Sequence, residues 1–214
     1  MENKKYYKKR YNLFSKFDEG IRLSDEQWFS VTPESVARVT ALQIKYRFPG
    51  TTRVADVFGG AAGNAIQLAL LFDSVIYNEI DTQVYEDAQH NASIYEVDSC
   101  IRFLNKDFFD LTDQDLKNVD VIFLSPPWGG PSYTSSEIWD ISECNLPAII
   151  NRVHELAPNC CAFLPRNTNL DQLADLLESI GYPNADLDYM YDRGHCVGMC
   201  VYWGKDFSPN DYTK

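Results

Sequence analysis

Strand-like and helix-like patterns alternate along most of the chain. Short apolar runs predict strands at residues 54–58, 74–78, 101–105, 119–124 and 159–164. Apolar residues at helical spacing lie between or after them, over 64–72, 82–95, 145–156 and 170–180. Two last runs, 186–191 and 196–203, predict an antiparallel hairpin at the sheet edge. The pattern predicts an α/β fold with a mostly parallel seven-stranded sheet covered on both faces.

The first 31 residues differ from the rest, because basic and aromatic side chains are mixed there without a clear period. We expect this stretch to be partly helical. Thr32-Pro33-Glu34 then predicts a helix start, with Thr32 as the cap and Pro33 at the first helical position. That helix should run to about Tyr46. The predicted organisation is an N-terminal extension, 1–31, that closes over the active site, and one α/β domain, 32–214.

Length and composition are those of one globular domain with a short extension: 214 residues, 45% hydrophobic and 23% charged. The apolar runs are too short to span a membrane, and the start lacks the apolar core of a signal peptide. The six cysteines form no CxxC pair and the three histidines are scattered, so no metal site is expected. We interpret the cysteines as reduced thiols of a nuclear or cytosolic protein.

The net charge of −12 argues against broad, sequence-independent binding to nucleic acid. The charge is unevenly distributed, since residues 1–22 hold seven basic and three acidic residues and the remainder carries −16. A basic arm on an acidic body suits a small, strongly anionic ligand group better than a long duplex.

A glycine-rich turn follows the first predicted strand, in the sequence Val54 to Asn64. Its small residues, Gly59, Gly60 and Gly63, let the backbone approach a ligand before a helix begins at about Asn64. Such a turn also occurs in dinucleotide and phosphate sites. Here Asp56 precedes the glycines, the spacing departs from GxGxxG, and no P-loop lysine follows. These features favour S-adenosylmethionine, whose ammonium Asp56 would bind.

Acidic residues follow the next two strands. Glu79 is the first candidate to accept the ribose hydroxyls of the cofactor and Asp81 the second. Asp107 is placed to accept from the adenine amine, and Phe108 to pack on the adenine ring. Together and in this order along the chain, the glycine-rich turn and the acids Asp56, Glu79 and Asp107 predict a nucleotide-cofactor site more strongly than any one of them does alone.

The fourth predicted strand ends in Ser-Pro-Pro-Trp-Gly-Gly-Pro-Ser-Tyr, residues 125–133. Two prolines cannot continue a strand and make the loop stiff. The Ser125 hydroxyl and the carbonyls of Ser125 and Pro126 can accept from one amine, and Trp128 offers a ring for a flat base. This combination is typical of amino-group methyltransferases.

Five segments together resemble the trimethylguanosine synthase family, which hypermethylates RNA caps: residues 13–18, 28–34, 56–64, 125–133 and 163–167. The resemblance covers about residues 5–204 and implies a Rossmann-like class I fold. It also implies transfer of methyl groups from S-adenosylmethionine to the exocyclic N2 of 7-methylguanosine caps. The substrates would be small nuclear and nucleolar RNAs, which implies a nuclear protein with partners among snRNP or snoRNP proteins.

The resemblance also implies roles for particular residues. Trp128 would stack on the methylated guanine, Ser125 and Pro126 would line the amine, and Asn91 would lie near the base. The remaining implied residues close over the cofactor from the N-terminal side (Phe14, Ser30 and Thr32) or hold the cap triphosphate (Lys5, Tyr133 and Arg166). The chain departs from the family in having Glu79 for Asp, and Val197 where a phosphate-binding lysine is common. Arg193 or His195 would have to replace that lysine.

The expected mechanism is a direct SN2 transfer without a metal or a covalent enzyme intermediate, driven by alignment, acceptors at the amine and desolvation. The first alternative is an N6-adenine or other amino methyltransferase on DNA or RNA, which shares the Pro-Pro-aromatic loop. Another is a cap-binding protein that has lost catalysis. A nicotinamide dehydrogenase is disfavoured, since it has no use for Ser-Pro-Pro-Trp. The pattern leaves open whether one methyl or two are added, and the oligomeric state.

Overall fold

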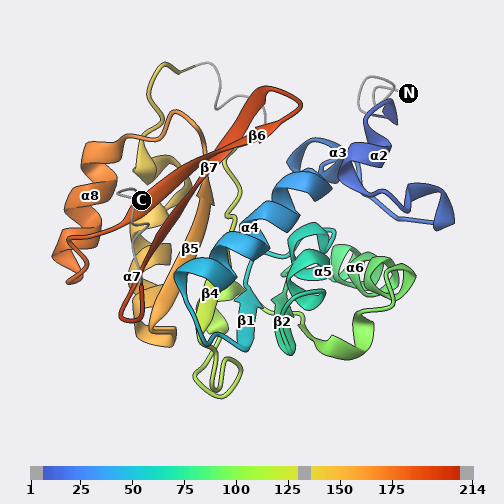
Figure 1. Cartoon of the computed structure of the whole chain (residues 1–214), viewed down its shortest axis with the longest axis horizontal. Helices are drawn as coiled ribbons and strands as arrows, with labels where there is room; N and C mark the ends of the chain where they lie inside the picture. Colours follow the sequence, from blue (N-terminus) through green and yellow to red (C-terminus); the bar gives the residue numbers. More distant parts are fainter. Residues whose placement is uncertain (1–6, 130–135, 208–214) are drawn as a thin grey trace.

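The computed structural model describes residues 7–129 and 136–207 (Figure 1). Seven strands form one sheet in the order β3-β2-β1-β4-β5-β7-β6. The strands are β1 (Arg53–Asp56), β2 (Ser74–Asn78), β3 (Ile101–Leu104), β4 (Val121–Leu124), β5 (Asn159–Leu164), β6 (Asp186–Asp192) and β7 (His195–Gly204). The first five run parallel, and β7 pairs antiparallel with both β5 and β6. The predicted mostly parallel sheet with a C-terminal hairpin is confirmed.

Helices connect the strands and also build the N-terminal extension. They are α2 (Arg10–Leu13), α3 (Gln27–Ser30), α4 (Glu34–Arg47), α5 (Gly63–Ala69), α6 (Thr82–Ile94), α7 (Leu146–Leu156) and α8 (Leu170–Ser179). Short 3₁₀ turns lie at Phe17–Glu19, Asp98–Cys100, Phe108–Asp110 and Ile141–Cys144. The helices predicted after residue 60 all occur, with ends that differ by a few residues.

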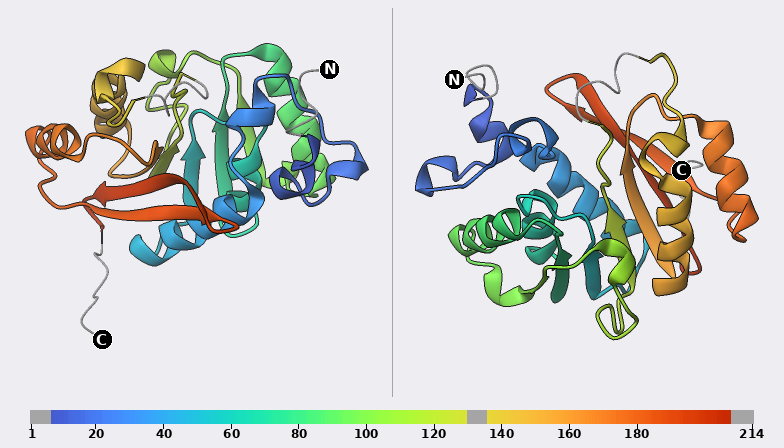
Figure 2. Two further views of the ribbon diagram at one scale, coloured as in Figure 1. Left: turned by 90° about the horizontal axis from the view of Figure 1, so that it is seen from above. Right: turned by 180° about the vertical axis from the view of Figure 1, so that it is seen from behind.

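Alternate residues of the sheet pack into two separate cores. In β4, Val121 and Phe123 belong to the core beneath α4, α5 and α6, whereas Ile122 and Leu124 belong to the core beneath α7 and α8. All four side chains are buried. Figures 1 and 2 show the two helical layers on opposite sides of the sheet. A strand with both faces covered must be apolar throughout, which explains the continuous apolar run in the sequence.

One detail of the predicted helix start is wrong. Helix α4 begins at Glu34, and Pro33 is the residue before its first turn, with its carbonyl accepting from the amides of Val36 and Ala37. Thr32 lies one residue further out and caps nothing. Its buried hydroxyl instead accepts from the Asn64 side chain, at 3.1 Å. The Thr32 hydroxyl thus binds Asn64, which is distant in the sequence, instead of capping the adjacent helix α4.

The N-terminal extension packs on α4 and α6. Glu34, in the first turn of α4, accepts from the Ser15 amide at 2.6 Å and from the Ser15 hydroxyl at 2.8 Å. The Tyr95 hydroxyl, at the end of α6, donates to the same carboxylate at 2.6 Å. Leu13 and Phe14 are buried in the core of this face. The extension is therefore joined to the domain by both polar and apolar contacts, while the boundary at residue 31 stays a prediction.

All six cysteines carry free thiols. Within residues 7–129 and 136–207, no group of three histidine, cysteine, aspartate or glutamate side chains is placed to hold a metal ion. In the same part of the chain, none of the helices has the length and apolar character that crossing a membrane requires.

Candidate active site

Four of the expected site residues lie at one edge of the sheet. Asp56 ends β1, Glu79 follows β2, Asp107 comes three residues after β3, and Ser125 follows β4. These four strands are parallel neighbours, so their carboxyl ends meet at the same edge. In open α/β sheets ligands bind outside this edge. Asp56 lies opposite Phe123 of β4, two residues before Ser125, so the two halves of the expected site are on adjacent strands.

Asp56 is completely buried, and neither carboxylate oxygen has a well-formed hydrogen bond to the described residues. Burial raises its pKa to about 7, the amides of Phe58 and Ala65 offset part of the rise, and the Glu79 charge adds to it. A buried carboxylate without a partner is costly. A cationic ligand group would satisfy it, so the ammonium of S-adenosylmethionine fits this position.

The glycine-rich turn has its shape for packing reasons. A Cβ at Gly59 would lie 2.1 Å from the Tyr77 ring of β2, so no larger residue fits there. The Tyr77 hydroxyl donates to the Gly60 carbonyl, and both Gly60 and Ala62 have positive φ. Helix α5 then begins at Gly63. Tyr77 thus packs against the turn at Gly59, whereas a Cβ at Gly60 would meet no atom within 4 Å, which leaves that side of the turn open to a ligand.

The extension covers the start of α5. A Cβ at Gly63 would lie 3.3 Å from Val31 and 3.8 Å from the Phe14 ring, and Thr32 is bound to Asn64 as described above. Phe14 is 2% exposed. Ser30 is exposed instead, and its hydroxyl donates to the backbone carbonyl of Glu26, the residue before α3. The structure therefore brings Phe14 and Thr32 to the turn, and a cofactor contact of Ser30 stays a prediction.

The two ribose candidates have different surroundings. Glu79 accepts from the Gly60 amide at 3.0 Å and, with its other oxygen, from the Asp81 amide at 3.0 Å. Asp81 caps α6 by accepting from the Val84 amide at 3.0 Å. Because the Glu79 carboxylate lies at the glycine turn and Asp81 is used as a helix cap, the geometry favours Glu79 for the ribose.

The expected adenine loop follows β3. Asp107 accepts from the Phe109 amide at 2.9 Å and is exposed, so a ligand can reach its carboxylate. Phe108 is 4% exposed and its ring packs on Phe58, with centroids 4.9 Å apart. Phe58 follows β1, so this ring pair joins the loops after β1 and β3.

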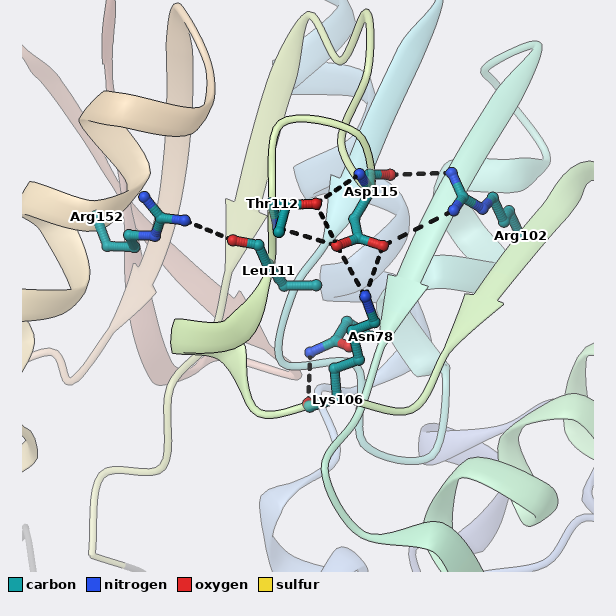
Figure 3. Close-up of polar contacts among 7 residues, drawn as sticks. All are labelled: Asn78, Arg102, Lys106, Leu111, Thr112, Asp115 and Arg152. Atoms are coloured by element: carbon teal, nitrogen blue, oxygen red, sulfur yellow. Dashed lines mark hydrogen bonds and ion pairs between the residues drawn. The ribbon is translucent and has the colours of Figure 1, made fainter.

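A polar cluster that the sequence pattern does not indicate anchors the loop after β3, which carries Asp107 (Figure 3). Asp115 accepts from Lys106 at 2.8 Å and from the Thr112 hydroxyl at 2.7 Å, and the Arg102 guanidinium lies 3.9 Å away. The Lys106 hydrogen bond is the main reason that the pKa of Asp115 falls to about 2. Asn78 of β2 donates to the Lys106 carbonyl at 3.1 Å. The loop that carries Asp107 is therefore bound to β2 and β3, and β2 is also the strand that packs against the glycine-rich turn.

Asn91, expected near the base, has another position. It is fully buried in α6, accepts from the Arg22 amide at 2.8 Å, and donates to the Arg22 carbonyl at 2.9 Å and the Ala61 carbonyl at 3.1 Å. Its amide thus joins the extension to the glycine turn. A contact between Asn91 and the base stays a prediction, and nothing in the local sequence indicates the observed role.

The start of the Ser-Pro-Pro-Trp loop follows β4 directly. Ser125 is half-buried and Pro126 buried. The Trp128 ring is half-buried against Phe163 of β5, with centroids 5.2 Å apart. Phe163 is held by β7, where a Cβ at Gly198 would lie 2.7 Å from its ring. The strands beneath therefore support Trp128. Residues 130–135, which include Tyr133, and Lys5 lie outside the described residues.

Arg166 lies just after β5, is exposed, and donates to the Cys196 carbonyl of β7 at 3.2 Å. It is thus bound to the neighbouring strand of the hairpin, two residues beyond the strand that supports Trp128. Arg193 and His195 lie at the exposed hairpin end. Val197 packs on the same core as Trp128. Which basic side chain replaces the usual lysine stays a prediction.

Comparisons with known proteins show the family of the chain. The family model described as RNA cap guanine-N2 methyltransferase matches residues 51–206. Trimethylguanosine synthase from Saccharomyces cerevisiae is 36% identical over 213 residues, covering 95% of this chain and 68% of the yeast protein. The Schizosaccharomyces pombe trimethylguanosine synthase is also 36% identical, over 208 residues, covering 94% of this chain and 85% of that protein.

Solved structures share the fold at low sequence identity. A human methyltransferase 10 domain containing protein matches 93% of this chain and 97% of its own, with a TM-score of 0.66 and 13% identity. A SAM-dependent O-methyltransferase from Thermotoga maritima matches 93% of this chain and 73% of its own, with a TM-score of 0.64 and 12% identity. The fold is thus that of the Rossmann-like methyltransferases, with S-adenosylmethionine as cofactor. From the matched family model and the two 36% identical relatives, the chain belongs to the RNA cap guanine-N2 methyltransferase family.

Proposed function

We propose that this protein methylates the exocyclic N2 of 7-methylguanosine caps on small nuclear and nucleolar RNAs. The product would be 2,2,7-trimethylguanosine, or the dimethyl cap if one methyl is added. The observation that carries this proposal is the pairing of β1 with β4, which puts Asp56 and the Ser125–Trp128 loop side by side. A site for a cationic amino-acid group and a site for a flat base with an amine then adjoin each other.

The proposed cofactor contacts follow the edge of the sheet. Asp56 would bind the ammonium, Glu79 the ribose and Asp107 the adenine amine, with Phe108 packed near the adenine ring. Bound S-adenosylmethionine supplies an electrophilic methyl group at this edge. The protein's contribution is to hold these groups in place, and the Asp115 cluster and Asn78 support it by anchoring the adenine loop.

Trp128 is the proposed platform for the cap base. A 7-methylguanine ring is cationic, so an indole face attracts it more strongly than an ordinary base. Stacking of a base on an aromatic ring contributes about 1–3 kcal/mol, and a desolvated cation–π contact about 2 kcal/mol; the two overlap and do not add. Phe163 already holds the indole ring in place from the sheet side, so binding of the base would not have to fix the position of the ring.

The amine is the nucleophile, and the proposed acceptors are the Ser125 hydroxyl and the carbonyls of Ser125 and Pro126. They would direct the nitrogen lone pair toward the methyl group. The bond from N2 to the methyl carbon would form as the sulfur–carbon bond breaks, S-adenosylhomocysteine would be the leaving group, and the methylated amine would then lose its proton to water. No covalent enzyme intermediate or general base is needed for this SN2 transfer. Arg166, with Lys5 and Tyr133 from outside the described residues, would bind the cap triphosphate.

The test is to replace Trp128 with alanine and, as a matched control, with phenylalanine. The alanine variant should lose cap methylation and bind a 7-methylguanosine cap about 5- to 150-fold more weakly, the range that stacking contributes. Its affinity for S-adenosylmethionine should stay that of the wild type, and phenylalanine should restore part of the cap binding. Full cap methylation by the alanine variant would contradict the site.

We infer a nuclear location and snRNP or snoRNP partners only from the proposed RNA substrates. They are tested by isolating the protein from cells with its bound RNA and identifying the RNA. Recovery of capped small nuclear or nucleolar RNAs is expected. Recovery of uncapped RNA or DNA, with methylation of adenine in it, would favour an amino methyltransferase on nucleic acid instead.

A further inference from the structure

A hollow opens between the hairpin end, α2 and the start of α4. Its volume is about 580 Å³, and we call it the hairpin hollow. Among the side chains that line it are two tyrosines and two arginines: Tyr11, Tyr191, Arg38 and Arg193. Tyr191 is 61% exposed and Tyr11 is 45% exposed. Exposed rings beside guanidinium groups are the combination with which proteins bind single-stranded nucleic acid.

The acidic residues of the hairpin hollow are already bound to the protein. Asp192 accepts from the Asn12 side chain at 3.4 Å and from the Ser35 hydroxyl at 3.2 Å. Glu34 is occupied by Ser15 and Tyr95, as described above. In contrast, Arg38 and Arg193 are exposed, and neither has an ion pair or a side-chain hydrogen bond with other described residues. Arg38 and Arg193 therefore keep free hydrogen-bond donors for a ligand, while Asp192 and Glu34 balance their charge, so the lining carries no net charge on a protein whose net charge is −12.

The turn that carries Arg193 is an unusual place for an arginine. Arg193 and Gly194 alone connect β6 to β7, and both have positive φ, 49° and 82°. Two-residue hairpin turns of this kind favour asparagine followed by glycine, because a residue with a Cβ is strained at positive φ. A long cationic side chain held in a strained conformation points to a function rather than to turn formation.

The hairpin hollow is linked to Arg166 through the two strands of the hairpin. Arg166 donates to the carbonyl of Cys196, and Cys196 lies opposite Tyr191 across the hairpin. The path from Arg166 to the hollow therefore crosses β7 to β6, about two strand spacings, or roughly 10 Å. An RNA whose cap base lies on Trp128 and whose triphosphate lies at Arg166 would extend toward the hairpin end.

We propose that the hairpin hollow binds the first nucleotides that follow the cap in the substrate RNA. This inference rests on the proposed function, because it takes a capped RNA as the substrate. Arg38 and Arg193 would contact backbone phosphates. The exposed Tyr191 ring would offer a stacking face, and so would the face of Tyr11 opposite Arg10, whose guanidinium lies 4.2 Å from the centre of the Tyr11 ring. Contacts of this type are indifferent to base sequence, so the hollow would favour a capped chain over a cap alone without selecting a particular RNA.

The test compares two substrates, a 7-methylguanosine cap dinucleotide and an otherwise identical capped pentanucleotide. The wild type should have a higher kcat/KM on the pentanucleotide. Arg38→Ala should lower kcat/KM on the pentanucleotide about three- to fivefold, the size of one exposed ion pair, and leave the dinucleotide unchanged. It should also reduce the salt slope of pentanucleotide binding by about 0.7. Arg193→Asn, which suits the positive φ, should lower kcat/KM on the pentanucleotide more than on the dinucleotide.

Lys117→Ala is the matched control. Lys117 is an exposed cation beside the start of β1, at the edge of the sheet opposite to the hairpin end, and its loss changes the net charge equally. It should behave as the wild type on both substrates. Equal kcat/KM of the wild type on the two substrates, or an Arg38→Ala variant that keeps the full preference, would overturn the inference. Absence of methylation on both substrates would instead contradict the proposed function, so the two failures are distinguishable.

Discussion

Asp56→Asn is the perturbation with the sharpest expected result, because the two residues have almost the same shape and differ in charge. Burial raises the pKa of Asp56 from 3.8 to about 7, a rise of about 3 units. At about 1.4 kcal/mol per unit, an ionised Asp56 costs the cofactor-free fold about 4 kcal/mol. The protonated form costs nothing of this kind, so the penalty depends on pH.

The sign follows from the raised pKa. A group whose pKa is higher in the fold contributes stability that is fully present below its unfolded pKa, near 4, and is lost as pH rises through 7. Between pH 5.5 and 8 the cofactor-free wild type should therefore lose about 2 kcal/mol that the asparagine variant keeps. A buried amide without partners has its own cost of about 1–3 kcal/mol, but that cost does not change with pH.

The assay is urea unfolding of both proteins without cofactor across this pH range, followed by calorimetric titration with S-adenosylmethionine at pH 8. The difference in unfolding free energy should shift by about 2 kcal/mol in favour of the variant as pH rises. The variant should bind the cofactor much more weakly, since the ammonium has lost its charge partner. Asp113→Asn is the control, because Asp113 is exposed. Parallel pH profiles together with unchanged cofactor affinity would refute the reasoning.

Three further variants test how the site is supported. Phe163→Leu removes the ring beneath Trp128, so cap affinity measured by fluorescence quenching should fall several-fold while cofactor affinity holds; an unchanged cap affinity would show that Trp128 needs no support. Asn91→Asp replaces a donor to two carbonyls by an acceptor, so cofactor affinity should fall and limited proteolysis should cut the extension faster; wild-type values for both would contradict the joint described for Asn91. Lys106→Met leaves Asp115 without its main partner, and since Lys106 is 40% exposed the stability loss should stay below about 1 kcal/mol in urea unfolding, with weaker cofactor binding as the more sensitive readout.

The parts that could be predicted from the sequence are those with a short-range pattern. The strands are recognisable because burial on both faces makes each one an apolar run, as in β4. Asp56, Glu79, Asp107 and Ser125 could be placed together because parallel strands bring their carboxyl ends to one edge. Their order along the chain thus already carries the geometry of the site.

The parts that could not be predicted depend on contacts between distant residues. Thr32 has the local pattern of a helix cap, but it binds Asn64, 32 residues away. Asn91 binds Arg22, 69 residues away, and a buried asparagine has no sequence signature that would distinguish it from an exposed one. The same holds for Asn78, whose amide joins two loops. Such polar side chains can be assigned only when the fold is known.

The central claim is N2 methylation of the 7-methylguanosine cap, and mass spectrometry of the product tests it most directly. The protein is incubated with S-adenosylmethionine and a 7-methylguanosine cap dinucleotide, with the unmethylated cap in a parallel reaction. The account predicts a gain of one or two methyl groups on the 7-methylated cap alone, because only the cationic base is held on Trp128. Equal methylation of both caps, or no methylation of either by a protein that binds the cofactor, would contradict it.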